Sequence, residues 1–194
     1  MGVKTDTRQR MVTSAALLIR ERGVAGTSVA GVLEHSNGPR GSVGFHFPGG
    51  RAELLADALR WVGGLVSSQL RAGVERGVAP ADLFRQICEH YRRELESTGY
   101  AAGCPIGAAA QEAYADSALG PIVAEIIDEW AALLAEAMTR TGREPEEASD
   151  TALLCISAME GAITLARVKR SPKPIDLALA AMLPVLSGDA HGHR

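Results

Sequence analysis

Histidine and cysteine are the residues of this chain that could do nucleophilic, acid–base or metal chemistry. The five histidines are His35, His46, His90, His191 and His193. They form no HExxH motif and no triad-like arrangement, and Cys104 has no histidine or lysine beside it on a helix that could activate it. Cys88, Cys104 and Cys155 include no CxxC pair, which predicts buried free thiols and neither a disulfide framework nor a zinc site. We therefore expect no enzymatic activity, no metal and no cofactor.

A different chemistry, contact with nucleic acid, is indicated by the segment from Thr27 to Leu55, TSVAGVLEHSNGPRGSVGFHFPGGRAELL. Arg40, Ser42 and His46 bring a guanidinium, a hydroxyl and an imidazole into one short stretch. Such groups hydrogen-bond to phosphate oxygens and to base edges. Gly41 and Ser42 are also small enough to approach a phosphate backbone. These groups can act together only if a short exposed helix presents them side by side.

The first element that must position them is a helix that ends just before this stretch. Thr27 or Ser28 can accept a hydrogen bond from a free amide of the next turn, as an N-cap does. An apolar stripe at helical spacing follows, and the helix is predicted to end near His35. Residues 36–39, Ser-Asn-Gly-Pro, tolerate left-handed or fixed φ and stop the helix in a tight polar turn.

The second element is a short helix predicted from Arg40 to about His46, with Pro39 suited to its first position. Val43 and Phe47 would face inward, and the exposed N-terminal end would enter a major groove. A helical hairpin of this length also occurs in proteins that bind no nucleic acid. The local pattern therefore leaves a purely structural hairpin open.

Charge favours the nucleic-acid interpretation. Residues 1–51 carry seven Lys or Arg against three acids, a net charge of +4. Because the whole chain has a net charge of −3, the remaining residues carry −7. A positive head on a negative body is expected when one end of a protein meets phosphate and the other does not.

The composition, and the glycines and prolines that end helices, predict an all-α chain of about nine helices. With 194 residues, 46% hydrophobic and 22% charged, the chain should fold as a soluble cytoplasmic protein. It shows neither a signal peptide nor an apolar run near the roughly 20 residues of a membrane helix, so we expect no membrane partner. Beyond the head, helices are predicted at 51–76, 81–97, 105–116, 120–141, 144–169 and 175–186. The predicted domains are a helix-turn-helix head at 1–50, an effector-binding and dimerisation body at 51–188 and a disordered tail at 189–194.

Two stretches of the chain resemble the TetR family of bacterial transcriptional regulators. Residues 11–36 resemble the family's first helix, the glycine and threonine that follow, and its second helix. Residues 38–55 resemble the turn, the recognition helix and the start of the fourth helix. The Phe-Pro-Gly-Gly run at 47–50 is similar to the branch that includes LmrA and YxaF, and GCPIGAAAQEA at 103–113 is similar to a segment of that branch.

The resemblance implies a repressor that binds a palindromic operator as a dimer, with two recognition helices about one DNA turn apart. The residues expected at DNA are Lys4, Arg8, Thr27, Ser28, Asn37, Arg40, Gly41, Ser42, Gly44, Phe45, His46 and Arg51. Arg40 and Ser42 are expected on bases or phosphates, and His46 on a phosphate or as a helix cap. Backbone clamps are expected from Lys4, Arg8, Thr27 and Arg51.

One position departs from the family pattern. Gly44 and Phe45 stand where the recognition helix usually carries a tyrosine followed by histidine or tyrosine. The family tyrosine contacts a DNA phosphate, so Gly44 removes one hydrogen bond and weakens the helix by about 1 kcal/mol. This departure leaves open a ligand-binding or partner-binding module with weakened operator recognition, and an activator with the same head is a further alternative.

The region between residues 81 and 141 resembles the family's effector-binding region. Its candidate ligand residues are Phe84, Cys88, Tyr91, Cys104, Ile106, Gln111, Tyr114, Ile126, Trp130 and Leu134, joined by Glu160 further along the chain. They suit a small apolar or amphipathic effector, although the apolar members also suit a plain core. Gln111 and Tyr114 are more informative, because a polar group beside an apolar stripe needs a partner. Glu160 could pair with a cationic ligand or with an arginine across a dimer.

The last two predicted helices are rich in small and medium apolar residues. They include Ala152, Leu153, Ile156, Met159, Ala162, Ile163 and Ala166, and then Leu177, Leu179, Ala181, Met182 and Leu183. One chain could bury these residues against its own body. The family resemblance implies instead that two helices from each subunit form a four-helix dimer interface. The long helix from Arg51 would then connect the body to the recognition helix.

Overall fold

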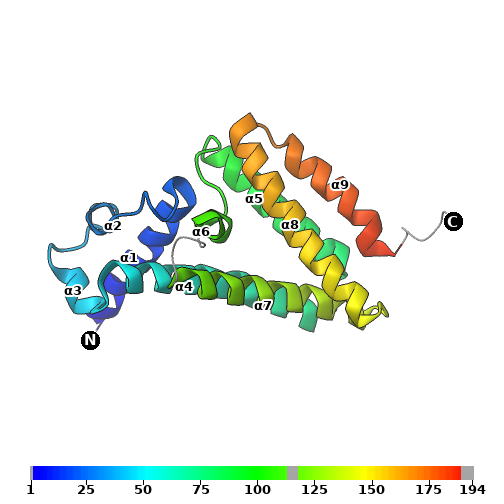
Figure 1. Ribbon diagram of the computed structural model, residues 1–194, viewed down its shortest axis with the longest axis horizontal. Coiled ribbons are helices and arrows are strands. Elements are labelled where there is room, and N and C mark those ends of the chain that lie inside the picture. The colour runs from blue at the N-terminus through cyan, green and yellow to red at the C-terminus, as the bar shows by residue number, and fades with distance from the viewer. Residues whose placement is uncertain (1, 113–117, 189–194) are drawn as a thin grey trace. The chain divides into compact units, whose positions relative to one another are not determined.

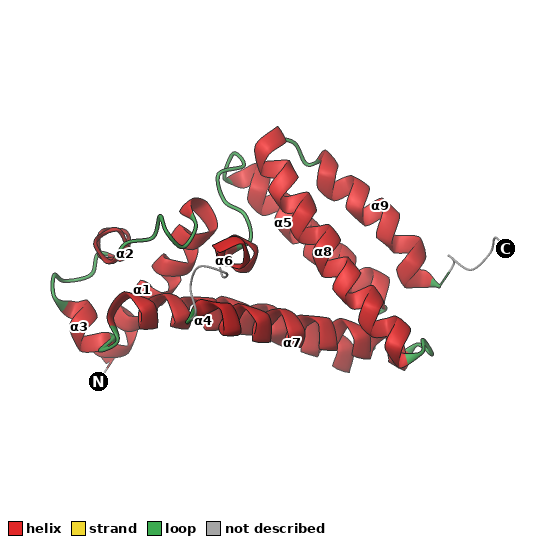
Figure 2. Ribbon diagram, in the orientation of Figure 1, coloured by secondary structure: helices red, strands yellow, loops and turns green. Residues whose placement is uncertain are grey.

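The computed structural model describes the backbone of residues 2–112 and 118–188, and side chains from residue 7 onward within those ranges. Every regular element in this part of the chain is a helix, which confirms the all-α prediction (Figures 1 and 2). The helices are α1 (Gly2–Arg22), α2 (Val29–Ser36), α3 (Ser42–His46), α4 (Gly50–Glu75), α5 (Pro80–Ser97), α6 (Pro105–Glu112), α7 (Leu119–Arg140), α8 (Pro145–Lys169) and α9 (Lys173–Ser187).

Most helix ends agree with the predicted ends to within two residues, because glycine and proline mark them. Proline stands at the start of α5 and α8, and the chain leaves α9 through Gly188 in a left-handed conformation. The predicted end of the helix from Pro105, at Asp116, lies outside the described residues.

The start of the recognition helix is a correction. α3 begins at Ser42 and not at Arg40, and Pro39 lies in the preceding turn and not at the first helical position. The reason is Gly41, which caps the helix with φ +85° and ψ −10°. Glycine adopts this left-handed conformation without the Cβ penalty of other residues, and the Ser42 amide donates to the Pro39 carbonyl at 3.1 Å to close the turn.

The described helices pack as two compact units. The first comprises residues from 1–65 and 104–126, and the second comprises residues from 66–103 and 127–194. The packing boundary thus differs from the predicted functional boundary at residue 50. The difference arises because α6, far along the chain, packs with α1. The helices α4 and α7 each contribute residues to both units.

The first unit is built on α1, which packs against α2 and α6. Six apolar residues of α1 are buried at helical spacing: Met11, Val12, Ala15, Ala16, Leu18 and Ile19. They are joined by Val32 of α2 and by Leu54, Leu55 and Leu59 of α4. This core holds the short helices α2 and α3 in place, since neither is long enough to be stable by itself.

In the second unit, α5, α8 and α9 pack together (Figure 1). The thiols Cys88 of α5 and Cys155 of α8 are buried and free, as predicted. Burial raises the pKa of each thiol to about 12. Among the described residues, α8 is the one helix long and apolar enough to cross a membrane, with a mean hydropathy of 1.4 over a window that is 44% buried. Core helices of folded proteins pass the same test, so this is weak evidence for a membrane span.

Candidate nucleic-acid interface

The turn between α2 and α3 is tightly held. Ser28 caps α2 by accepting a hydrogen bond from the Gly31 amide at 3.1 Å, and Asn37 ends the helix in the left-handed conformation with φ +51°. The Gly38 amide donates to the Leu33 carbonyl at 2.8 Å. A Cβ on Gly38 would lie 2.9 Å from Cε of Met11, so a larger residue here would have to displace the Met11 side chain. The turn therefore fixes the direction in which α3 leaves α2.

One face of α3 is anchored in the core of the first unit. Val43 and Phe47 are buried, which confirms that they face inward, and the Phe47 amide donates to the Val43 carbonyl at 2.7 Å. The guanidinium of Arg8 lies over the Phe47 ring, 4.9 Å from its centroid, and pairs with Asp57 of α4. Arg8 thus braces α3 and α4 in this structure, although its side chain remains 44% exposed.

The opposite face of α3 and the turn before it are open to solvent. Arg40, Gly41, Gly44 and Phe45 are exposed, and Ser42 and His46 are half-buried. The Ser42 hydroxyl donates to the Pro39 carbonyl at 2.6 Å, which leaves its oxygen available as an acceptor. The structure therefore brings together the predicted contact residues 40–42 and 44–46 on one surface.

Gly44 and Phe45 give this surface its particular shape. A Cβ built on Gly44 would meet nothing within 4 Å, and its φ lies outside the left-handed region, so neither space nor backbone requires glycine there. Phe45 is 65% exposed, and its ring meets the His46 ring edge-on with centroids 5.0 Å apart. An aromatic side chain thus stands on α3 beside a position that carries no side chain.

Thr27 and Arg51 are corrections to the predicted backbone clamps. Thr27 is 1% exposed, and its hydroxyl donates to the Gly23 carbonyl at 2.8 Å, so it is not placed to contact a phosphate. Arg51 is half-buried; its Nε donates to the Thr27 carbonyl at 2.9 Å and its Nη2 donates to the Val24 carbonyl. Both side chains brace the loop between α1 and α2. The side chain of Lys4 lies outside the described residues.

Glu112 is a residue of this unit that the sequence pattern did not single out. Its carboxylate accepts hydrogen bonds from the amides of Val24 at 2.8 Å and Ala25 at 2.7 Å. The α1–α2 loop is therefore held through its amides by α6 and through its carbonyls by Arg51 of α4. No local pattern could have predicted these hydrogen bonds, because Val24 and Ala25 lie 88 and 87 positions before Glu112 in the chain.

The predicted ligand residues divide between the two units. The first unit holds Cys104, Ile106, Gln111 and Ile126; the second holds Phe84, Cys88, Tyr91, Trp130, Leu134 and Glu160; Tyr114 lies outside the described residues. The apolar members are all buried, as are Cys88, Cys104 and Tyr91, while Glu160 is half-buried. Gln111 is exposed on α6, so the structure does not place it in a pocket. The Gly107 amide at the start of α6 meets the Cys104 sulfur at 3.4 Å.

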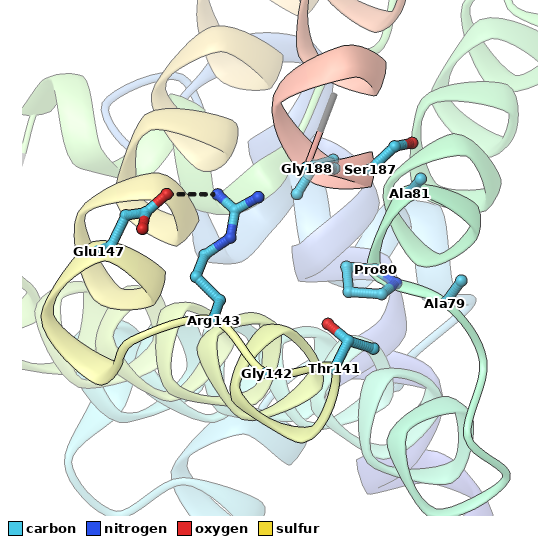
Figure 3. A pocket seen from close by; sticks show the side chains of 10 residues that line it. Ala79, Pro80, Ala81, Thr141, Gly142, Arg143, Glu147, Ser187 and Gly188 are labelled. Atoms are coloured by element: carbon cyan, nitrogen blue, oxygen red, sulfur yellow. Dashed lines mark ion pairs between the residues drawn. The ribbon is translucent and has the colours of Figure 1, made fainter. Parts of the chain in front are cut away.

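A pocket of about 510 Å³ lies in the second unit, and its lining includes none of the ligand residues predicted there (Figure 3). Its lining comes from Ala79, Pro80, Ala81, Thr141, Gly142, Arg143, Glu147, Leu186, Ser187 and Gly188. Arg143 pairs with Glu147 at 3.4 Å, and it also donates to the Thr151 hydroxyl at 3.1 Å and to the Val185 carbonyl. Its guanidinium therefore ties the start of α8 to the end of α9. The described residues hold no group of three or more His, Cys, Asp or Glu that could bind a metal ion.

Comparison with known proteins gives consistent matches. Residues 80–181 match the family model described as "Transcriptional regulator LmrA/YxaF-like, C-terminal domain". The HTH-type transcriptional regulator Rv0196 of Mycobacterium tuberculosis is 42% identical over 176 residues, which cover 88% of this chain and 89% of the relative. LmrA of Bacillus subtilis is 24% identical over 93% of this chain and 96% of its own. A TetR transcriptional regulator from Chloroflexus aurantiacus has a similar structure, with a TM-score of 0.72, 26% identity and coverage of 96% and 97%.

Proposed function

The chain belongs to the LmrA/YxaF-like branch of the TetR family of transcriptional regulators, and on this premise we propose that it is a homodimeric, cytoplasmic repressor released from a palindromic operator by a small apolar or amphipathic effector. The relatives are regulators and not enzymes. The proposed division of labour places operator binding in residues 1–50 and effector binding and dimerisation in residues 51–188. The proposal rests mainly on one observation: α3 exposes one face to solvent, while Val43 and Phe47 hold its other face in the core.

That surface suits a DNA major groove. Arg40 and Ser42 supply a fork of donors and a hydroxyl beside a backbone that Gly41 keeps free of side chains. Val43 and Phe47 are buried on the other face, so α3 can insert into the groove while it stays packed on the rest of the unit. A helix held in this way presents its polar side chains to base edges while flanking groups bind phosphates.

The proposed dimer interface uses the solvent-facing side of α8 and α9. Large apolar residues are exposed there: Leu153, Leu154, Leu165, Val168 and Leu177. In α8, Leu154, Gly161, Leu165 and Val168 follow each other at spacings typical of one helix face, and a Cβ on Gly161 would meet nothing within 4 Å. An apolar stripe of this kind is expected to be covered by a partner, and a second copy is the natural one.

The predicted residues of this interface need correction. Ala152, Ile156, Met159, Ala162, Ile163, Ala166 and Met182 are buried within the single chain. Their burial agrees with the packing of α5, α8 and α9 against one another in the second unit. The sequence left open whether the apolar residues of α8 lie in the core of one chain or in a dimer interface. One face of α8 is buried in the chain's own core, and the other is available to a partner.

The proposed release mechanism is a shift between two conformations. An effector that binds one conformation of the body more tightly lowers operator affinity by its differential free energy for that conformation. In the first unit, Glu112 provides a route by which a displacement of α6 would reach the α1–α2 loop. Equal effector affinity for free and operator-bound protein would exclude this mechanism.

The experiment that tests the function is selection of bound sequences from randomised duplex DNA at near-physiological salt, where phosphate attraction alone does not dominate. We expect a palindrome with two protomers bound. Salt-sensitive binding without a sequence motif would contradict the repressor proposal. It would favour the partner-binding module that Gly44 leaves open.

A further inference from the structure

Phe45 is the large apolar side chain that the described part of the helix-turn-helix exposes to water. We propose that it determines operator specificity by contacting the C5-methyl group of a thymine in the major groove. The inference rests on the proposed DNA-binding function and names what one residue of that surface recognises.

The aromatic ring of Phe45 does not belong to the buried side of α3. Val43 and Phe47 supply the buried side of α3, and Phe45 is 65% exposed on the other side. A side chain with this much apolar surface in water gains free energy when a partner covers it. The gain is largest when the partner presents an apolar group, because a phenyl ring forms no conventional hydrogen bond that could replace those lost to water.

The surroundings of Phe45 favour close approach to a groove. Gly44 carries no side chain, and a Cβ there would meet nothing within 4 Å, so the surface beside the ring is recessed. Gly41 at the start of α3 is exposed as well. The edge-on contact with His46, with ring centroids 5.0 Å apart, limits the orientations of the Phe45 ring. The ring is thus a protruding apolar contact on a surface of otherwise small and polar groups.

The chemistry of the major groove then narrows the choice of base. Base edges there offer hydrogen-bond donors and acceptors, and the thymine methyl is their one apolar group. Placing the ring over a donor or an acceptor would remove water from it without replacing the hydrogen bond, which is unfavourable. Phe45 should therefore select thymine at one position of each half-site.

The test replaces single thymines by deoxyuridine in the operator recovered by the wild-type protein, since this removes only the methyl group. We expect one thymine per half-site at which the wild-type protein loses affinity about fourfold, the value of one buried methyl-sized group. Phe45→Ala should bind the parent operator more weakly and show no further loss at that thymine. Phe45→Leu, which keeps an apolar side chain, should retain part of the discrimination.

Two controls separate this result from other effects. The melting temperatures of both variants should equal that of the wild type, because the side chain is exposed. The salt dependence of their DNA affinity should also be unchanged, because phenylalanine neutralises no phosphate.

Each remaining outcome overturns the proposal. If Phe45→Ala and the wild type lose equal affinity at every deoxyuridine, another residue contacts the methyl group. If the wild type is insensitive to all replacements, its binding to the selected operator still supports the proposed function while the role of Phe45 is excluded. If selection recovers no motif, the proposed function fails and the Phe45 inference fails with it.

Discussion

The carboxylate of Glu112, the last residue of α6, lies directly over Gly23 in the loop after α1. Gly23 has φ +75°, and a Cβ built on it would overlap Oε1 of Glu112. The same oxygen accepts the Val24 amide at 2.8 Å. The close approach of the two chain segments thus requires glycine for two reasons, the left-handed backbone and the space that the carboxylate occupies.

Gly23→Ala should therefore destabilise the protein more than a left-handed glycine substitution does elsewhere. Gly77→Ala is the matched control, because Gly77 has φ +70° and a Cβ there meets nothing within 4 Å. The control should lose about 1–2 kcal/mol from backbone strain alone. Gly23→Ala should lose more, since the Glu112 carboxylate must also move. Urea unfolding of both variants measures the difference, and equal losses would show that the Glu112 contact is not maintained in solution.

Arg40→Ala should weaken operator binding about tenfold or more, if the guanidinium binds a base edge or a phosphate of the DNA. Arg93→Ala is the control, because Arg93 is an exposed arginine of α5 outside the helix-turn-helix. A phosphate contact would also reduce the slope of log affinity against log salt by about 1, whereas a base contact would relax specificity at one position. Fluorescence anisotropy at several salt concentrations distinguishes these cases, and equal affinities of the two variants would exclude Arg40 from the interface.

Gly44→Ala should stabilise the protein by up to about 1 kcal/mol, because alanine has the higher helix propensity and its Cβ meets no neighbour. Gly38→Ala should act in the opposite direction, since its Cβ would lie 2.9 Å from Met11 and 3.0 Å from Leu33. Chemical unfolding of the two variants checks both signs. A loss of stability in Gly44→Ala would mean that α3 differs from the helix described here.

Val168→Glu should convert the proposed dimer into monomers and abolish binding to a two-fold operator. Val168 is 78% exposed in one chain, so the change leaves the core of the subunit intact, but it would bury a charge in the proposed interface. Sedimentation velocity gives the oligomeric state and circular dichroism confirms the fold. Arg93→Glu, which also places an acid on an exposed helix, is the control and should leave the assembly unchanged. A dimer that survives in Val168→Glu would place the interface elsewhere.

Cys88 and Cys155 should react with thiol reagents only after unfolding. Burial raises the pKa of each from an ordinary value of 9.0 to about 12, so the reactive thiolate is scarce at pH 8. Labelling with a coloured disulfide reagent, with and without urea in a Cys104→Ala background, measures the protection. Rapid labelling of the native protein would contradict the burial of the two thiols.

The same shift predicts how stability depends on pH. Both thiols hold their protons more tightly in the folded protein, so their contribution to stability is complete below pH 9 and is lost as pH rises towards 12. Cys88→Ala and Cys155→Ala together should make alkaline unfolding less steep over this interval. An identical pH profile would show that other groups govern it.

The helices and the buried face of α3 could be predicted from the sequence. Glycine, proline and helical apolar spacing are local signals, so the ends of α4, α5, α7, α8 and α9 and the start of α6 were predictable, as were the buried Val43 and Phe47. The start of α3 was less so, because Arg40 and Pro39 suit a turn as well as a helix and the backbone of Gly41 decided between them.

The folded chain was needed to see which polar side chains stabilise the fold and which stay available to a partner. Thr27 and Arg51 look like phosphate contacts in the sequence, yet both are committed to carbonyls of the α1–α2 loop. The amides of that loop are met by Glu112, and the apolar residues of α8 divide between a buried and an exposed face. Each outcome depends on groups brought together from distant parts of the chain. A hydrogen bond or a buried contact needs two groups that lie close together in the folded chain. The local sequence around one group does not show which distant residue will lie beside it.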